Sequence, residues 1–358
     1  MEQRKVKVLI VDDSAYMRLF LGDIIAGSRG LELVATARDG EDALLKIKRY
    51  KPDVVTLDVE MPRLNGVETL KRIMQENPLP VIMVSSYTRK GSEITVEALA
   101  LGAVDFVAKP SRFTDDFTRE FKRELPLKIT HAARAHLDHE RPFTVPVEKS
   151  SPSLQRKDVT PLPSLSPLHT VRFVVAIGAS TGGPRALEMV LKGLPADLPA
   201  AAFITQHMPP GFTRSLAERL DKVCPIKVKE AVHGEDIVES RVYLAPGGYH
   251  LLAEKKGIVS LSEAAPVNHV RPSVDVMMES LVEAYGSSVV GVILTGMGRD
   301  GSDGMAMIKE KGGRTIVQDP ATAVIPGMPE AVIRRGLADK IVPLNQIAKT
   351  IDLFLRQE

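Results

Sequence analysis

A serine between glycines is the first group in this sequence whose setting favours chemistry. Ser180 follows the apolar run 174–177 and lies between Gly178 and Gly182 in a GxSxG spacing. A hydroxyl that attacks a substrate needs an exposed place on a sharp turn, and the glycines leave room for that turn. A glycine-rich turn also suits a bound phosphate, although the P-loop lysine and the dinucleotide spacing are missing here. Taken alone, the segment predicts a nucleophile, an anion or nucleotide site, or a plain turn.

A serine nucleophile needs a base and an acid that orients this base, and both residue types follow other apolar runs. His207 comes after the run 201–205, and Asp300 lies in the glycine-rich segment that follows the run 289–295. The carboxyl ends of parallel strands line one crevice, so Ser180, His207 and Asp300 are expected together there. Asp303 is the competing acid, with a helix-cap role as its alternative. The sequence thus predicts a catalytic triad.

The order of the three groups along the chain is Ser, His, Asp, which differs from that of the α/β-hydrolases, so we expect a convergent site. A developing oxyanion needs two donors near the nucleophile, and the backbone amides of Thr181 and Met297 are the predicted donors. His233, His250 and His269 are further histidines of this half, and a structural role is the alternative to a catalytic one for each of them. For His269, a place on the substrate-binding surface is a second alternative.

A second group of polar residues follows strand-like runs in the first 110 residues. They are Asp12 and Asp13, Asp58, Ser85 and Lys109. Converging carboxylates repel one another unless a hard divalent cation such as Mg²⁺ lies between them. The alternative is that these acids are simply solvated at the ends of strands. Five residues of suitable type at the expected strand ends disfavour that alternative. The sequence therefore predicts an acidic, metal-binding pocket.

These residues resemble the receiver domain of bacterial two-component response regulators, over about residues 5–122. The resemblance implies that Asp58 accepts a phosphoryl group whose oxygens contact Ser85 and Lys109, while Mg²⁺ assists the transfer. It gives Phe106 the place of the family's switch aromatic, with plain core packing as the alternative. The metal ligands that it implies are Asp12, Asp13, Asp58 and the backbone carbonyl of Glu60.

Alternating strands and helices must position the acidic pocket. Five apolar runs between residues 5 and 110 alternate with helical patterns, which predicts a flavodoxin-like, doubly wound, five-stranded parallel sheet. A last helix is expected from Phe113 to about Leu125. Residues 126–169 are rich in proline and serine, which predicts a partly extended linker between two domains.

A second doubly wound α/β domain is expected over residues 170–355. Apolar runs predict strands at 173–177, 202–205, 242–245 and 289–295. The segments 249–253 and 257–261 are typical of an antiparallel hairpin, so we expect a mostly parallel but mixed sheet.

Composition excludes several classes of protein. The chain has 358 residues, of which 44% are hydrophobic and 26% charged, with a net charge of +2. This balance does not favour nucleic acid or membranes. A single cysteine, Cys224, rules out internal disulfides and fits a reducing compartment. No signal peptide or membrane-spanning stretch is evident, so we expect a cytoplasmic protein.

Four segments of the second half, 178–183, 206–209, 271–275 and 295–301, together resemble the catalytic domain of chemotaxis protein-glutamate methylesterases. The order of receiver and catalytic domain matches the complete chemotaxis response regulator methylesterase. The resemblance implies hydrolysis of glutamate methyl esters on chemoreceptors with release of methanol, and no cofactor in the esterase site. It also implies a histidine kinase as phosphodonor, a receiver that covers the cleft until Asp58 is phosphorylated, and deamidation of receptor glutamines in many members.

Two other classes of function are weighed against this one. A response regulator with a non-catalytic output half would bind DNA, a protein or a nucleotide. No basic recognition helix is evident for DNA, and a nucleotide site at 178–183 leaves His207 and Asp300 unexplained. The sequence does not reveal whether an ester or an amide is the preferred substrate, because it does not reveal the pocket that holds the leaving group.

Overall fold

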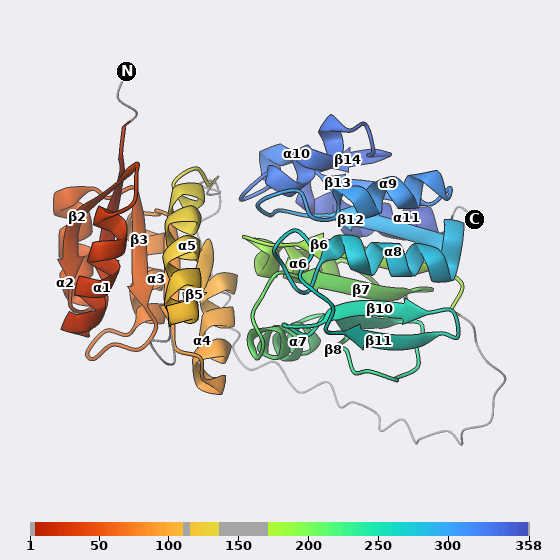
Figure 1. The fold of residues 1–358 in the computed structure, drawn as a ribbon, viewed down its shortest axis with the longest axis horizontal. Helices are drawn as coiled ribbons and strands as arrows, with labels where there is room; N and C mark the ends of the chain where they lie inside the picture. Colours follow the sequence, from red (N-terminus) through yellow and green to blue (C-terminus); the bar gives the residue numbers. More distant parts are fainter. Residues whose placement is uncertain (1–3, 110–114, 136–170, 357–358) are drawn as a thin grey trace.

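The structure is a computed structural model that describes residues 4–109, 115–135 and 171–356. Figure 1 shows two α/β units side by side, with α4, α5 and β5 of the first on the side facing the second. No helix of the described residues is long and apolar enough to cross a membrane.

The first unit is the expected five-stranded parallel sheet, in the order β2-β1-β3-β4-β5. Met17, Leu21, Ile24 and Ile25 bury one face of the first helix, which Ser14 caps. Its elements are β1 (Val6–Val11), α1 (Ala15–Ala26), β2 (Leu31–Ala37), α2 (Gly40–Tyr50), β3 (Val54–Asp58), α3 (Gly66–Glu76), β4 (Val81–Ser85), α4 (Arg89–Ala100), β5 (Asp105–Ala108) and α5 (Asp115–Ala132).

Helix α5 corrects one boundary. The sequence predicts that it ends near Leu125 and that the linker begins at Pro126, but the helix continues to Ala132. Proline lacks an N–H and usually ends a helix. Here apolar packing outweighs that cost, since Leu125 and Ile129 are both fully buried on either side of it. Residues 136–170 lie outside the described part of the chain, so the linker itself stays a prediction.

The second unit has a seven-stranded sheet in the order β14-β13-β12-β6-β7-β9-β8, and each of its pairings is parallel. Its elements are β6 (Val174–Ala179), α6 (Gly183–Lys192), β7 (Ala201–Gln206), α7 (Phe212–Val223), β8 (Lys227–Glu230), β9 (Arg241–Leu244), β10 (His250–Glu254), β11 (Ile258–Ser262), α8 (Val274–Tyr285), β12 (Val289–Ile293), α9 (Ser302–Glu310), β13 (Arg314–Gln318), α10 (Gly327–Arg334), β14 (Lys340–Val342) and α11 (Ile347–Arg356).

The predicted hairpin exists, but the main sheet is not mixed, because β10 and β11 pair with each other as a separate two-stranded sheet. The hairpin packs against α8 instead, burying Leu251, Ala253 and Val259. The strands β8, β13 and β14 were not anticipated. Helices α6, α7 and α11 bury residues on one side of the large sheet, while α8, α10 and the hairpin cover the other.

The strand order of the second unit positions the residues of the predicted triad. Strand β6 lies at the centre with β7 on one side and β12 on the other. The chain runs outward from β6 through β7 and later returns to β12, so the order reverses beside β6. In doubly wound sheets, such a reversal opens a crevice at the carboxyl ends of the strands. The segments after β6, β7 and β12 carry Ser180, His207 and Asp300.

Candidate functional site

Ser180 lies on a tight turn directly after β6. Its amide donates to the Thr295 carbonyl at 3.0 Å, and its own carbonyl accepts from the Gly183 amide at 2.7 Å. Gly182 has φ 76°, a left-handed conformation that residues with a side chain rarely adopt. At Gly178 a Cβ would lie 2.5 Å from a methyl of Val274, so only glycine allows the start of α8 to approach. Gly182 therefore serves the expected sharp turn, whereas Gly178 serves the close approach of α8, which the sequence did not predict.

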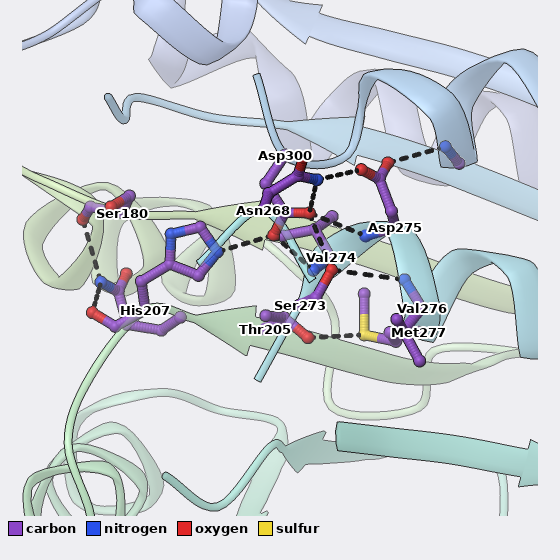
Figure 2. A network of polar contacts seen from close by, with 12 residues as sticks. Ser180, Thr205, His207, Asn268, Ser273, Val274, Asp275, Val276, Met277 and Asp300 are labelled. Carbon is purple, nitrogen blue, oxygen red and sulfur yellow. Dashed lines mark hydrogen bonds and ion pairs between the residues drawn. The ribbon is translucent and has the colours of Figure 1, made fainter. Parts of the chain in front are cut away.

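His207 and Asp300 are brought together as the sequence predicts. Nε2 of His207 lies 2.8 Å from Oδ2 of Asp300. The histidine is partly exposed, with 13% of its side chain accessible, whereas Asp300 is buried. Figure 2 shows the second ring nitrogen, Nδ1, on the side of Ser180. Because Nε2 faces Asp300, the ring nitrogen left for Ser180 is Nδ1.

Asp300 is held as an anion at the N-terminus of α8. The Val274 amide donates to Oδ2 at 2.7 Å, and the Ser273 hydroxyl donates to Oδ1 at 2.8 Å. The Asp275 amide and the Asn268 side-chain amide each approach Oδ1 at 3.3 Å. Burial alone would raise the pKa of Asp300, but the bonds from His207, Val274 and Ser273 hold it below its usual range. Helix N-termini favour negative charge for the same reason.

Asp275 is a second buried acid beside Asp300. Its carboxylate accepts from the Gly304 amide at 2.8 Å and from Asn268 at 2.9 Å. Burial, together with the charge of Asp300, raises the pKa of Asp275 to about 7. Sequence reasoning missed the roles of Ser273, Asp275 and Asn268. The segment 271–275 was recognised only as part of a family resemblance, and a serine before a helical pattern was the available signal for a helix N-terminus.

The two amides expected to form the oxyanion hole are available. Within the described residues, the backbone N–H groups of Thr181 and Met297 donate to no protein acceptor. Thr181 is buried at 8% exposure. Both residues flank the nucleophile, since a Cβ on Gly296 would lie 2.8 Å from Cβ of Ser180.

The competing residues lie elsewhere. Asp303 is in the first turn of α9, where it pairs with Arg335 at 2.7 Å. His233 accepts from the Leu261 amide at 3.2 Å, and His269 is exposed on the turn beside Asn268. Asp300 rather than Asp303 is therefore the acid that contacts His207.

The acidic pocket of the first unit also forms. Carboxylate oxygens of Asp12, Asp13 and Asp58 lie within 4.8 Å of one another. The ammonium of Lys109 bridges Asp12 and Asp58 at 2.9 and 2.8 Å. Burial raises the pKa of Asp58 to about 6, against the opposing charge of Lys109 and with the help of Asp12. Three carboxylates against one ammonium leave an excess of negative charge, and these hard oxygen donors fit a cation such as Mg²⁺.

The other residues expected at the acidic pocket of the first unit are Ser85, Glu60 and Phe106. Ser85 is fully buried at the end of β4, and its hydroxyl lies 3.2 Å from the Gly91 carbonyl. The amide of Glu60 approaches Asp58 at 3.4 Å, and the role of its carbonyl stays a prediction. Phe106 is buried at 3% exposure, as its core-packing alternative requires. Its ring stacks on Phe212 of the second unit at 4.5 Å, a contact that the sequence did not reveal.

The first unit touches the nucleophile turn itself. The Thr181 hydroxyl donates to Oδ2 of Asp105 at 2.5 Å, and the Gly182 amide donates to the Val104 carbonyl at 3.2 Å. Lys128 on α5 holds the other oxygen of Asp105 at 3.2 Å. We call Thr181, Gly182, Val104 and Asp105 the turn clamp. It places the start of β5 directly against the residues that follow Ser180.

Comparisons with known proteins agree on both units. Residues 8–117 match the family model of the response regulator receiver domain, and residues 175–351 match that of the CheB methylesterase. A protein of Symbiobacterium thermophilum is 47% identical over 98% of this chain and 97% of its own length. A protein of Pyrococcus horikoshii is 45% identical over 97% of this chain and 93% of its own length. Both are named protein-glutamate methylesterase/protein-glutamine glutaminase. Among solved structures, the Thermotoga maritima CheB methylesterase catalytic domain is 43% identical, covering 51% of this chain and 97% of that one with a TM-score of 0.49.

Proposed function

This chain belongs to the family of CheB methylesterases that carry a response regulator receiver domain, and on that premise we propose that Ser180 is its catalytic nucleophile. The chain is a protein-glutamate methylesterase of chemotaxis, and the names of its relatives indicate protein-glutamine glutaminase activity as well. The observation that carries the residue assignment is the contact of 2.8 Å between His207 and Asp300, beside the turn on which Ser180 is partly exposed.

In the first half of the reaction, Oγ of Ser180 attacks the ester carbonyl while Nδ1 of His207 takes the hydroxyl proton. The free amides of Thr181 and Met297 donate to the oxyanion. The tetrahedral intermediate then breaks its bond to the methoxy oxygen, which takes the proton from His207 and leaves as methanol. Water attacks the acyl-enzyme by the same route and leaves glutamate. With a glutamine substrate, the group that leaves is ammonia.

Asp300 fixes the proton of the histidine on Nε2 and stabilises the imidazolium that forms. The charge needed for this role survives burial because α8 directs amides at the carboxylate. An ordinary buried carboxyl would take up a proton more readily and lose this charge. The helix N-terminus is therefore part of the proposed machinery.

We further propose that the receiver restrains this site until Asp58 is phosphorylated. The turn clamp joins the start of β5 to the nucleophile turn, and Lys109 follows the other end of the same strand. Lys109 lies about 13 Å along the strand from Asp105. A phosphoryl group on Asp58 would draw Lys109 away from Asp12. A shift of β5 or of Phe106 then weakens the clamp and frees the cleft, which biases an existing equilibrium.

Receiver domains generally bind Mg²⁺ in an acidic pocket, and Asp12, Asp13 and Asp58 with the Glu60 carbonyl are the proposed ligands here. When bound, the ion neutralises charge on the phosphoryl oxygens. The proposed substrates are methylated glutamates of chemoreceptors, and the proposed phosphodonor is a chemotaxis histidine kinase. The proposed compartment is the cytoplasm.

The test of the nucleophile is methanol release from a methylated chemoreceptor. Ser180→Ala should release methanol at no more than about one thousandth of the wild-type rate, because loss of a triad nucleophile removes covalent catalysis. Ser262→Ala, on the hairpin, is the matched control and should keep the wild-type rate. Retention of most activity by Ser180→Ala would reject the assignment.

A further inference from the structure

A buried histidine with no assigned role lies behind the catalytic acid. His250 opens β10 and is 1% exposed. Its Nδ1 lies 3.2 Å from the Ser273 amide nitrogen, and its Nε2 lies 3.2 Å from the Ala265 carbonyl. A backbone N–H only donates and a carbonyl only accepts. These partners therefore require a neutral ring with its single proton on Nε2.

The surroundings of His250 agree with that state. Burial lowers the pKa of His250, and the nearby Arg271 lowers it further, against the opposing charge of Asp300. A protonated ring would place an N–H of its own against the Ser273 amide. The ring is thus a fixed acceptor aimed at one backbone group.

That backbone group belongs to the cap of α8. Ser273 is fully buried and is the N-cap residue, and its hydroxyl donates to Asp300 at 2.8 Å. The next amide, that of Val274, donates to the same carboxylate at 2.7 Å. Fixing the Ser273 amide therefore fixes two of the donors that aim Asp300 at His207.

We propose that His250 is a positioning residue of the esterase, which holds the Ser273 cap so that Asp300 orients His207 toward Ser180. This inference rests on the proposed triad. The series of contacts runs from β10 through Ser273 and Asp300 to His207, and each link is a hydrogen bond between buried or half-buried groups. Displacement of a reacting group by about 1 Å costs on the order of 100-fold in rate.

The competing explanation is that His250 only satisfies two buried backbone groups. His233 offers a matched control, because its Nδ1 also accepts a backbone amide, that of Leu261, at the same 3.2 Å. Leu261 is on β11 of the same hairpin, and within the described residues no hydrogen bond links His233 to Asp300. The two histidines differ in the residue from which they accept a hydrogen bond. Ser273, the partner of His250, also bonds to Asp300, whereas Leu261, the partner of His233, is on the hairpin.

Two substitutions separate the two ring nitrogens. Asn places its side-chain oxygen near the position of Nδ1 and keeps the acceptor for Ser273. Gln places its amide near the position of Nε2 and keeps only the donor to Ala265. His250→Gln should therefore slow the site about 10- to 100-fold, whereas His250→Asn should stay within about threefold of wild type and His233→Gln within about twofold.

The readout is the rate at which phenylmethanesulfonyl fluoride labels Ser180 in the full chain with a phosphodonor and Mg²⁺, followed by peptide mass spectrometry. The serine oxygen bonds to sulfur, fluoride leaves, and His207 takes the proton. Methanol release under the same conditions should show a loss in kcat with KM within about twofold. An Asn variant as slow as the Gln variant, or a Gln variant as fast as wild type, would overturn the proposal.

A double-mutant cycle distinguishes positioning from general damage. In the Asp300→Ala background, His250→Gln should slow labelling by less than about twofold, because its effect passes through Asp300. The same fold-loss in both backgrounds would contradict the inference. His250→Ala takes the place of His250→Gln in the cycle if the Gln variant does not fold. Failure of Ser180 to be labelled in wild type would instead reject the triad, so the two failures are distinct.

Discussion

Loss of the Thr181 hydroxyl should release the restraint that the receiver places on the esterase. Thr181→Val removes the bond to Asp105 and keeps the shape of the side chain and the backbone amide of residue 181. The bond is 2.5 Å long, between buried groups, and ends on a carboxylate. In the undocked state water satisfies both groups, whereas in the docked state the substitution leaves Oδ2 of Asp105 without this donor.

The size of the effect follows from that geometry. A hydrogen bond to a charged group contributes about 1.5–3 kcal/mol, and each 1.4 kcal/mol is a factor of about 10 in an equilibrium constant. The docking equilibrium should therefore weaken by about 10- to 150-fold. Basal activity should rise by up to this factor, with the phosphorylated rate as its ceiling.

The assay is methanol release from methylated receptors with and without a small-molecule phosphodonor. Asp105→Asn tests the same bond from the receiver side, where the change cannot touch the chemistry. Ser92→Ala is the graded control, because its hydroxyl meets that of Ser215 at 2.8 Å across the same interface without a charge. It should raise basal activity only about 2- to 10-fold, as expected for a bond worth about 0.5–1.5 kcal/mol. Unchanged basal rates in both Thr181→Val and Asp105→Asn, with normal phosphorylated rates, would refute the clamp.

Three further predictions concern the two sites. The pKa of Asp300 is held below its ordinary 3.8, so its charge contributes stability that is present above pH 3.8 and is lost as the pH falls further. The difference in free energy of unfolding between wild type and Asp300→Asn, measured by urea titration, should therefore shrink below that pH. A difference that stays constant would contradict this. Mg²⁺ at ten times its dissociation constant should stabilise the protein by about 1.4 kcal/mol, and Asp13→Asn should weaken this response in thermal melts; an equal response would remove Asp13 from the ligands. A Cβ on Gly183 would lie 1.9 Å from Oε1 of the buried Gln206, so Gly183→Ala should cost about 1–3 kcal/mol in chemical denaturation, and an unchanged midpoint would show that this side chain can move.

The sequence was sufficient for residues that follow strands. Ser180, His207, Asp300 and the acids of the receiver all come at the ends of apolar runs, and a parallel sheet brings such ends together. Strands with long apolar runs were readable, such as β3, β4, β6 and β7, which are buried throughout. The prediction of strands failed at β8 and β14, whose short segments are partly exposed, and at β13, whose apolar core of two residues is too short to stand out.

Contacts between distant side chains were not readable. Ser273 and Asp300 are 27 positions apart, and their contact depends on how α8 packs against the sheet and the hairpin. The turn clamp joins residues 76 positions apart in different domains. Neither periodicity nor strand-end position carries such information. The same holds for Pro126, whose cost to a helix is visible in sequence, whereas the packing that offsets it is not.

The most direct test of the account is methanol release by the full-length chain, measured before and after addition of a phosphodonor with Mg²⁺, for wild type, Ser180→Ala and Asp58→Asn. The account predicts that phosphorylation accelerates the wild type, that Ser180→Ala stays inactive in both states, and that Asp58→Asn keeps the basal rate in both. A phosphodonor that accelerates Asp58→Asn as much as wild type, or a Ser180→Ala variant that still releases methanol, would contradict it.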